Sequence, residues 1–403
     1  MKPIPYGRQD INADDINAVV ETLQSDFLTQ GPKIAEFEKA FAEYIGCKYA
    51  VAVSNGTAAL HLSALALGLN PGEKVITTPI TFAASANCVR YCGGEVHFSD
   101  IDPDSYLIDI PKVRKLLESS PKGAFKGIIP VDFAGRAVDL EALRKLADEF
   151  GLWIVEDACH APGGYFVDSN GNQQRCGNGV FAELAIFSFH PVKHIAAGEG
   201  GMITTNDRTL YEKLLVLRTH GITRNHAEFQ NTISFATGSD EASEAFPGWY
   251  MEMQTLGFNY RITDFQAALG ENQLRRADEG LRKRREIARR YDEAFSGHSL
   301  IKSHLLELGS EAGKHAYHLY VIRTPRRLGL YNYLRSKNII CQVHYIPTHL
   351  MPYYRNLGWE EGMLPEAEAY YRECLSLPMY PTLSLEDHQK VISEILIFFS
   401  KYV

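Results

Sequence analysis

The fold of this chain is decided by the stretch Glu183-Leu-Ala-Ile-Phe-Ser-Phe-His-Pro-Val-Lys-His-Ile-Ala-Ala-Gly-Glu-Gly-Gly-Met-Ile-Thr-Thr-Asn206. Residues 184–187 form a short and fully apolar run, which is typical of a strand that is buried on both faces. A glycine-rich break at 198–201 precedes a second short strand, which we expect at 202–205. Lys193 therefore lies in a loop just past a strand end, where ligands bind in open α/β sheets.

Lys193 is a candidate nucleophile. A partly desolvated lysine has a lowered pKa and can form a Schiff base with an aldehyde such as that of pyridoxal phosphate (PLP). The hydroxyl of Ser188 is suited to a phosphate, and the glycines at 198–201 allow the backbone to approach a ligand closely. Most lysines are solvated surface residues, and these neighbours are what favour a functional Lys193 over that alternative.

A metal site is the competing interpretation of the same loop. His190 and His194 are four residues apart and would face one metal ion if the loop were helical. Pro191 stands between them and no third ligand is nearby in the sequence. We therefore expect no metal here, and a metal-dependent hydrolase remains a distant alternative.

Length, charge and cysteine content limit the class of protein. A chain of 403 residues exceeds the size of most single cores, so two domains are expected. The net charge of -8 argues against broad contact with nucleic acid or anionic lipid. The sequence shows neither a signal-peptide pattern nor a membrane-spanning run, and its seven cysteines include no Cys-x-x-Cys pair. These features predict a cytoplasmic protein with reduced thiols.

The order of the predicted elements indicates an α/β fold. Strands are expected at 49–53, 74–78, 96–98, 127–131 and 152–155, and helices at 10–23, 34–45, 58–67, 83–91, 110–119 and 140–150. This alternation predicts a mostly parallel, doubly wound sheet covered by helices. A hairpin tip is expected at 167–172.

The second half of the chain has a different pattern. Residues 218–249 read as a polar excursion, least ordered at 237–243, and the basic run 275–290 reads as a solvated helix after a helix at 265–273. Further strands are expected at 316–322 and 339–344, with helices at 328–336, 365–374 and 384–399. We assign a large domain to 1–280, with 1–30 lining the site, and a small α+β domain to 281–403.

Two further groups follow strand ends. In Ser54-Asn-Gly-Thr57, Gly56 and Thr57 lie at a predicted helix N-terminus, which favours a phosphate. A plain helix cap by Ser54 or Thr57 is the alternative. Phe82 lies just past the next strand and suits stacking on an aromatic cofactor, although such residues more often join the core.

Two carboxylates follow the strand at 152–155 in the segment Glu156-Asp-Ala-Cys-His160. A carboxylate in this place can keep the pyridine nitrogen of PLP protonated, so that the ring acts as an electron sink. We choose Asp157 for this role, with a helix N-cap as the alternative. His160 is suited to pack on the ring or to bond its phenolic oxygen.

Five motifs in the same order resemble those of the DegT/DnrJ/EryC1/StrS family of sugar aminotransferases, and the resemblance covers nearly the whole chain. The motifs are Ser54-Asn-Gly-Thr-Ala-Ala-Leu60, Glu156-Asp-Ala-Cys-His160, Ser188-Phe-His-Pro-Val-Lys193, Gly198-Glu-Gly-Gly201 and Gly257-Phe-Asn-Tyr-Arg-Ile-Thr-Asp264. Four others are most similar to family members that act in pseudaminic acid biosynthesis: Leu28-Thr-Gln-Gly-Pro32, Thr77-Thr-Pro-Ile-Thr-Phe82, His220-Gly-Ile-Thr-Arg224 and Gln342-Val-His-Tyr345.

The resemblance implies a PLP-dependent transferase of fold type I that works as a homodimer. It implies L-glutamate as amino donor and a UDP-linked 4-keto-6-deoxy sugar as acceptor. Lys193 matches the Schiff-base lysine, and Asp157 matches the partner of the pyridine nitrogen. The other matched positions are the phosphate groups Gly56, Thr57 and Ser188, the ring neighbours Phe82 and His160, the phosphate contact Asn259 of the other subunit, and the sugar-nucleotide site Tyr6, Asp26, Phe27, Leu28, Thr29, Gln342, Val343, His344 and Tyr345.

The chain departs from the family pattern at two places. Ala196 and Ala197 stand where relatives often carry two threonines, which removes a hydroxyl contact from this loop. The segment 225–249 looks longer than in close relatives, so its part in the dimer contact is open.

The implied mechanism is ping-pong, with Lys193 moving the proton between the donor Cα and C4′ of the cofactor as general acid and base. A transaminase for another 3- or 4-keto sugar nucleotide is the nearest alternative. A dehydratase of the same fold is disfavoured, because the dehydratases of this family resemble the chain except for a histidine at position 193.

Overall fold

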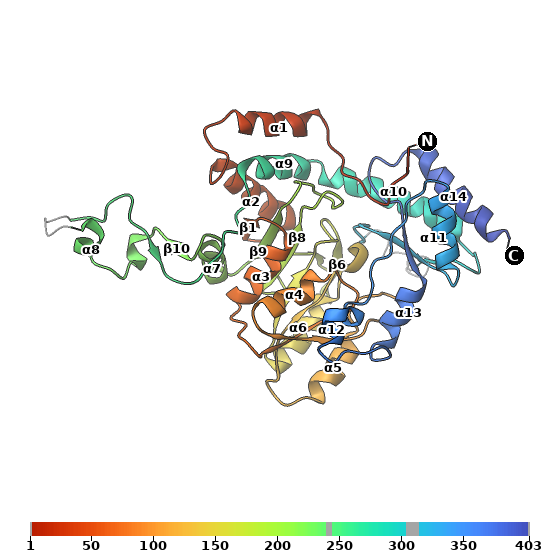
Figure 1. Cartoon of the computed structure of the whole chain (residues 1–403), viewed down its shortest axis with the longest axis horizontal. Coiled ribbons are helices and arrows are strands. Elements are labelled where there is room, and N and C mark those ends of the chain that lie inside the picture. The colour runs from red at the N-terminus through yellow and green to blue at the C-terminus, as the bar shows by residue number, and fades with distance from the viewer. Residues whose placement is uncertain (1, 239–243, 304–313, 402–403) are drawn as a thin grey trace.

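A seven-stranded sheet forms the centre of the protein (Figure 1). The computed structural model describes residues 2–238, 244–303 and 314–401. In spatial order the strands are β1 (Tyr49–Val53), β9 (Gly201–Thr205), β8 (Leu184–Ser188), β5 (Trp153–Asp157), β4 (Phe125–Ile129), β2 (Lys74–Thr77) and β3 (Glu95–Phe98). Only β9, among these seven, runs antiparallel to its neighbours, so the predicted mostly parallel sheet is confirmed.

Both faces of the sheet are buried, as the apolar strands predict. In β5, Ile154 and Val155 are both buried, and they pack into different core clusters because successive side chains point to opposite faces. Helices α3 (Gly56–Ala66), α4 (Ala84–Tyr91) and α7 (Arg208–Arg218) share a core with one face. The other face is covered by α2 (Pro32–Ile45), α5 (Ile110–Glu118), α6 (Leu140–Phe150) and α9 (Asp264–Leu274), and α1 (Ala13–Leu23) packs on α9.

The register of the sheet brings several candidate residues to one edge. Val53 at the end of β1 and Ser188 at the end of β8 both pair with Gly201, the first residue of β9. Asp157, the last residue of β5, pairs with Ile186, two residues before Ser188. The carboxyl ends of β1, β5 and β8 therefore meet beside the loop that carries Lys193.

The C-terminal part has its own core. This core is built from the three-stranded antiparallel sheet of β12 (Lys302–Ser303), β13 (Tyr320–Arg323) and β14 (Cys374–Leu377), with α11 (Arg327–Ser336) and α14 (Leu385–Phe399). Helices α12 (Pro352–Arg355) and α13 (Pro365–Glu373) pack into the core of the large sheet instead. Helix α10 (Ala277–Phe295) runs through the boundary that we expected at 280, and buried residues in it join the C-terminal core. The domain boundary stays a prediction.

The smaller elements complete the chain. The hairpin predicted near 167–172 is present, between β6 (Tyr165–Val167) and β7 (Gln173–Arg175). Short 3-10 turns are found at Phe133–Gly135, His226–Glu228 and Thr348–Leu350. Within the described part of the chain, no helix has both the length and the apolar composition that crossing a bilayer requires.

One prediction about the C-terminal part is wrong, and another is right except for its last residue. Residues 339–344 form no strand, because their backbone pairing is divided between Ile4, which meets Ile339, and Ser376, which meets Gln342. The strand in this part of the chain is β14 instead, which begins at Cys374. The helix that we expected at 365–374 therefore ends one residue earlier.

We expected the basic helix to be solvated, but it is not solvated throughout. Arg284 in α10 is buried, with 1% of its surface exposed, and Nη1 donates to the carbonyls of Tyr317, His318 and Met379. These carbonyls replace the water that a guanidinium would otherwise need. Arg284 thereby fixes the segment on which His318 lies.

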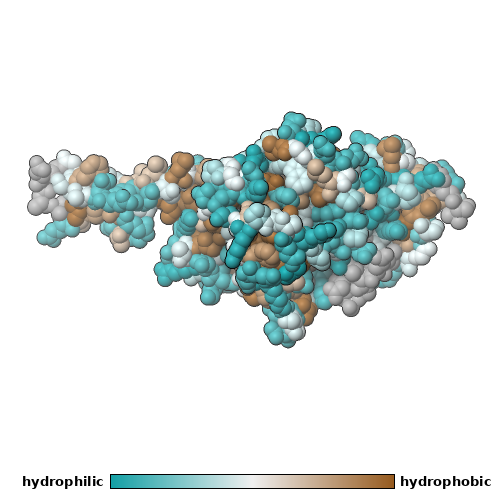
Figure 2. Space-filling model, turned by 90° about the horizontal axis from the view of Figure 1, so that it is seen from below, coloured by the Kyte–Doolittle hydropathy of each residue, from teal (hydrophilic) through white to brown (hydrophobic). Residues whose placement is uncertain are grey.

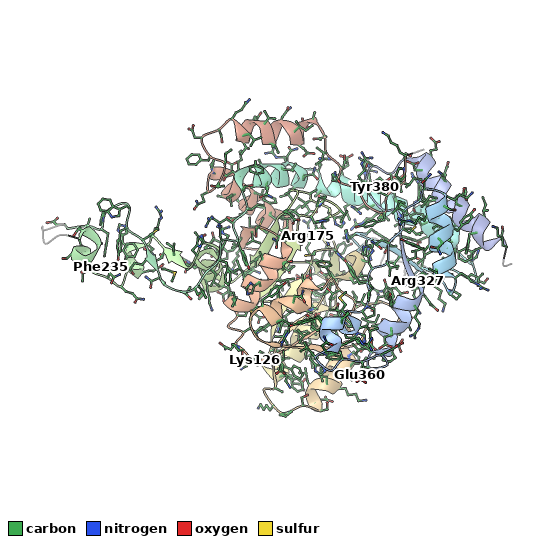
Figure 3. All side chains as sticks on the ribbon, in the orientation of Figure 1. Lys126, Arg175, Phe235, Arg327, Glu360 and Tyr380 are labelled. Carbon is green, nitrogen blue, oxygen red and sulfur yellow. The ribbon has the colours of Figure 1, made fainter. Side chains whose placement is uncertain are left out.

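The predicted excursion is an arm that projects from the body of the molecule (Figure 1). It contains β10 (Ile222–Thr223), α8 (Ile233–Thr237) and β11 (Glu252–Met253), and Figure 3 labels Phe235 near its far end. Most of the segment predicted as least ordered, 237–243, lies outside the described residues. Brown apolar patches lie along the arm in Figure 2, and the exposed apolar side chains there are those of Phe235, Trp249, Met251, Met253 and Leu256.

Candidate active site

The loop that carries Lys193 is closed at its base by backbone hydrogen bonds. The N–H of Phe189 donates to the carbonyl of Gly200 over 2.8 Å, and the N–H of Ala197 donates to Phe189 over 2.9 Å. Within the loop, the N–H of Lys193 donates to the carbonyl of His190 over 2.8 Å. These bonds anchor Lys193 beside the carboxyl ends of β5 and β8.

The amine of Lys193 is partly removed from water. Burial lowers the pKa of Lys193 from its ordinary value, whereas the nearby Cys159 and Asp157 act in the opposite direction. Desolvation disfavours the ammonium form, so more of the amine is neutral than in a solvated lysine. A neutral amine is the form that attacks a carbonyl carbon.

Asp157 and Glu156 point to opposite sides of β5. The Asp157 carboxylate accepts from Ser85 Oγ over 2.7 Å and from the N–H of Cys159 over 3.2 Å, and its charge acts on Lys193. Glu156 instead accepts from the N–H of Gly177 over 2.9 Å. No helix follows Asp157, so the alternative of a helix N-cap is excluded.

Glu156 belongs to a buried cluster behind the site. Burial raises the pKa of Asp132 to about 6, and burial together with the charge of Asp132 raises the pKa of Glu156 well above its usual value. Two carboxyl groups in such a place hold a proton between them. With Cys176, they form the one described group of three His, Cys, Asp or Glu side chains close enough to share a metal ion.

The two histidines of the competing metal interpretation lie in different surroundings. His190 is exposed, whereas Nε2 of His194 lies 2.8 Å from the carbonyl oxygen of Ala316. A carbonyl only accepts, so this nitrogen carries the proton and is not free to bind a metal.

The N-terminus of α3 lies beside Ser188. Asn55 is the N-cap and accepts from the N–H of Ala58 over 2.8 Å, so the alternative of a cap at Ser54 or Thr57 is wrong. This cap leaves the N–H groups of Gly56 and Thr57 outside its hydrogen bond, at the positive end of the helix dipole. A phosphate is suited to this position.

Two glycines allow these elements to come together. A Cβ on Gly56 would lie 3.0 Å from Cβ of Ser188, and a Cβ on Gly201 would lie 2.6 Å from the carbonyl carbon of Asn55. The distance at Gly201 is shorter than a side chain tolerates, and a side chain at Gly56 would require Ser188 to shift by a few tenths of an ångström, so larger residues would push α3 away from the ends of β8 and β9.

His160 and Tyr345 are joined by a directed hydrogen bond. The N–H of Ala134 donates to Nδ1 of His160 over 3.2 Å, so the proton of the neutral ring is on Nε2. Nε2 lies 3.2 Å from the phenolic oxygen of Tyr345 and donates to it. Burial and the charge of Lys193 hold the pKa of His160 well below its usual range, so the ring stays neutral.

The aromatic candidates surround this pair. Phe82 is 64% exposed, rather than buried in the core, and its ring centroid lies 6.4 Å from that of Tyr345. Tyr6 of the N-terminal segment lies against His344, with 5.3 Å between the ring centroids. His344 itself is turned toward β14, where Nδ1 lies 2.8 Å from Ser376 Oγ.

The remaining candidates are more peripheral. Asp26, Phe27, Leu28 and Thr29 are exposed, and the carbonyl of Leu28 accepts from the N–H of Asp264 at the start of α9. Gln342 is exposed and Val343 is partly buried. Asn259 is exposed and pairs through its backbone with Thr219. Ala196 and Ala197 are buried.

Sequence reasoning missed three polar residues near the site. Ser85 and Thr81 form a hydrogen-bonded pair that reaches Asp157, and the ring centroid of His318 lies 4.2 Å from that of His160. Thr81 precedes α4, which begins at Ala84, so its spacing of four from Ser85 is not a helix-face signal. The sequence offered no signal for any of the three.

A lysine amine, a carboxylate and a helix N-terminus suited to an anion meet at the edge of an α/β sheet, and this fold and site define the class of PLP-dependent transferases of fold type I. The chain belongs to the DegT/DnrJ/EryC1/StrS aminotransferase family, whose model matches residues 9–396. Aminotransferases of this family depend on PLP, and the residues present fit its phosphate, ring nitrogen and aldehyde. The protein is a sugar aminotransferase.

Three known proteins illustrate the relationship. The spore coat polysaccharide biosynthesis protein SpsC of Bacillus subtilis is 37% identical over 97% of this chain and 96% of its own length. The UDP-4-amino-4,6-dideoxy-N-acetyl-beta-L-altrosamine transaminase of Campylobacter jejuni is 34% identical, over 95% and 94%. The structure of Helicobacter pylori PseC, an aminotransferase of pseudoaminic acid biosynthesis, superposes with a TM-score of 0.86 at 30% identity, covering all of both chains.

Proposed function

We propose that the protein transfers an amino group from L-glutamate to the C4 ketone of a UDP-linked 4-keto-6-deoxy-N-acetylhexosamine. The product is UDP-4-amino-4,6-dideoxy-N-acetyl-β-L-altrosamine, an intermediate for pseudaminic acid. The observation that carries the chemistry is the meeting of Lys193, Asp157 and the N-terminus of α3 at one sheet edge. The names of two relatives, PseC and the Campylobacter enzyme, support the choice of substrate.

Each end of the cofactor has its own group of residues in this proposal. PLP supplies an aldehyde for the incoming amine and a ring that accepts electrons from the adjacent carbon. Gly56, Thr57 and Ser188 hold the phosphate, and Asp157 holds the proton on the pyridine nitrogen. Phe82 and His160 are the neighbours of the ring.

Lys193 carries the proton in this mechanism. Beside Asp157 and Cys159, its amine would be free to act as a base once PLP held the amine of L-glutamate. Its lowered pKa would suit it to move a proton from Cα of the donor to C4′ of the cofactor, and in the opposite direction when the keto sugar is the acceptor.

We assign the sugar nucleotide to the region around Tyr345. Tyr6, which lies against His344, belongs to this proposed site together with the segment 342–345 and residues 26–29. Tyr345 is the strongest polar candidate, because His160 donates to its oxygen and leaves the phenolic proton to point elsewhere. Burial raises the pKa of Tyr345, so that proton stays in place.

We further propose a homodimer with shared active sites, in which Asn259 contacts the phosphate of the other subunit. Support comes from the exposure of Asn259 and from the apolar side chains on the projecting arm. Apolar patches of this kind mark interaction surfaces.

The domain division at 280 and a cytoplasmic location remain part of the proposal. The seven cysteines, all free in the structure, fit a reducing compartment.

A transaminase for a different keto sugar nucleotide is the second candidate. The specific observation in its favour is the 37% identity to SpsC, whose name refers to spore coat polysaccharide. The two candidates share every step at Lys193 and differ only in the sugar.

One experiment separates them. The purified protein is incubated with L-glutamate and a panel of UDP-linked 4-keto and 3-keto sugars, and each product is identified by mass spectrometry and NMR. The proposal expects amination at C4 of the 4-keto-6-deoxy-N-acetylhexosamine at the highest kcat/KM. Preferential amination of another sugar would support the second candidate, and no amination of any of them would overturn both.

A further inference from the structure

Both oxygens of the Asp157 carboxylate are already held by the protein. Oδ1 accepts from the N–H of Cys159 over 3.2 Å, and Oδ2 accepts from Ser85 Oγ over 2.7 Å. Ser85 lies in α4, on a different element from Asp157, and both side chains are buried. The contact from α4 is the shorter of the two, as expected for a hydroxyl that donates to a carboxylate.

The direction of the hydrogen bonds follows from the chemistry. An ionised carboxylate only accepts, so Ser85 uses its single proton on Asp157. Thr81 Oγ1 lies 2.8 Å from Ser85 Oγ, and it must then be the donor in that contact. The chain of donation therefore runs from Thr81 to Ser85 to Asp157.

An ordinary helix contact does not explain Ser85. Serines in helices often donate to a carbonyl of the preceding turn, and Ser85 Oγ does lie near the carbonyl of Phe82. That distance is 3.5 Å, at the limit of a hydrogen bond, whereas the distance to Asp157 is 2.7 Å. The hydroxyl is therefore committed to Asp157.

The loop that carries Thr81 is fixed from the C-terminal part of the chain. The N–H of Thr348 donates to the carbonyl of Pro79 over 2.9 Å, and Thr348 Oγ1 lies 3.3 Å from the carbonyl of Thr81. Thr348 is buried and lies three residues after Tyr345. This relay, the chain of hydrogen bonds from Thr81 through Ser85 to Asp157, is thus tied to the segment that carries Tyr345.

We propose that Thr81 and Ser85 are positioning residues that hold the Asp157 carboxylate in the one orientation in which it faces the pyridine nitrogen of the cofactor. The inference rests on the role proposed above for Asp157. Without Ser85, Oδ2 would be a buried acceptor with no donor on that side, and the carboxylate would turn or draw in water. Its charge would then act less directly on the ring nitrogen.

The test uses Ser85→Ala and Thr81→Val, with Ser63→Ala as the matched control. Ser63 is also buried in a helix, but its hydroxyl donates to the carbonyl of Ala59 in its own helix over 2.8 Å. Each variant is loaded with PLP, and three quantities are measured: kcat, the PLP dissociation constant, and the pH midpoint of the visible absorption band of the bound cofactor. Thermal unfolding of each variant shows that it is folded.

Ser85→Ala should lower kcat by about 10- to 100-fold, the loss expected for a hydrogen bond to a charged group. The pH midpoint of the cofactor band should move in the same direction as in Asp157→Asn. Thr81→Val should have a smaller effect of the same sign, Ser85→Thr should restore most of the loss, and Ser63→Ala should match the parent. In an Asp157→Asn background, Ser85→Ala should cost little more, because residues that act through one another are not additive.

The outcomes distinguish the role of Asp157 from the positioning role of Ser85 and Thr81. If Asp157→Asn leaves kcat and the cofactor band unchanged, the role assigned to Asp157 fails. If Asp157→Asn is impaired but a folded Ser85→Ala keeps the parent's kcat and band midpoint, the relay is refuted and the role of Asp157 stands. Full additivity of the two substitutions would also refute the relay.

Discussion

The phenolic oxygen of Tyr345 lies 3.2 Å from Nε2 of His160, and the hydrogen bond runs from the histidine to the tyrosine. Tyr345 is therefore free to donate its own proton to the substrate. Tyr345→Phe should lower kcat/KM for the sugar by about 10- to 100-fold, because a hydrogen-bond donor is lost. Tyr353→Phe is the control, since Tyr353 is exposed and contacts Arg90. Equal kinetics in both variants would remove Tyr345 from the site.

Asp157→Asn keeps a polar side chain of the same size but removes the negative charge. Cofactor binding should largely survive, whereas turnover should fall on the order of a hundredfold or more, a loss of roughly 3 kcal/mol. The measurement is steady-state kcat beside a PLP titration. Unchanged turnover would contradict the assignment, and Glu156 offers no replacement because it points to Gly177 on the other side of β5.

The Asp132 and Glu156 pair predicts how stability depends on pH. Both pKa values are raised in the folded protein, to about 6 for Asp132 and well above normal for Glu156. A raised carboxyl pKa contributes stability that is fully present below the unfolded value and is lost as the pH rises through the folded value. The pair therefore makes the protein less stable as the pH rises above about 4, the ordinary carboxyl value, through about 6 for Asp132 and through the raised value of Glu156.

Glu156→Gln should reduce this loss. The glutamine keeps an oxygen for the N–H of Gly177 and carries no charge that would repel Asp132. At about pH 8 the free energy of unfolding should rise by about 1 to 3 kcal/mol relative to the parent, measured by denaturant titration of both proteins with PLP. Exposed Glu360, labelled in Figure 3, provides the control substitution Glu360→Gln. A variant as pH-sensitive as the parent would show that the pair does not titrate.

Mixed dimers test the shared active site. Lys193→Ala removes the chemistry, and Asn259→Asp places a negative charge beside the phosphate. When the two variants are unfolded together and refolded, a two-fold dimer gives one site with both lesions and one with neither. Activity should rise well above that of either parent. If Asn259 acts within its own subunit, every site carries a lesion and no recovery can appear.

The sequence predicted the parts of the site that lie next to one another along the chain. Lys193 follows an apolar strand, Asp157 ends another, and Gly56 begins a helix, so each position follows from local pattern and sheet geometry. The doubly wound order of strands, which places them at one edge, followed from the alternation of elements. These predictions needed no knowledge of side-chain packing.

The rest depended on packing between distant segments. Ser85 reaches Asp157 from another helix, and neither residue's neighbours in the sequence indicate that contact. The burial of Arg284 depends on three carbonyls that lie far along the chain. Residues 339–344 are apolar enough for a strand. They form no continuous ladder, because β13 pairs with β14 instead.

Reduction of the bound cofactor tests the central claim most directly. The purified protein, loaded with PLP, is treated with borohydride, digested, and analysed by peptide mass spectrometry. The account predicts a yellow protein in which the reduced cofactor is fixed to Nζ of Lys193, on the peptide that contains Ser188 and Gly198. A reduced adduct on any other lysine, or none at all, would contradict it.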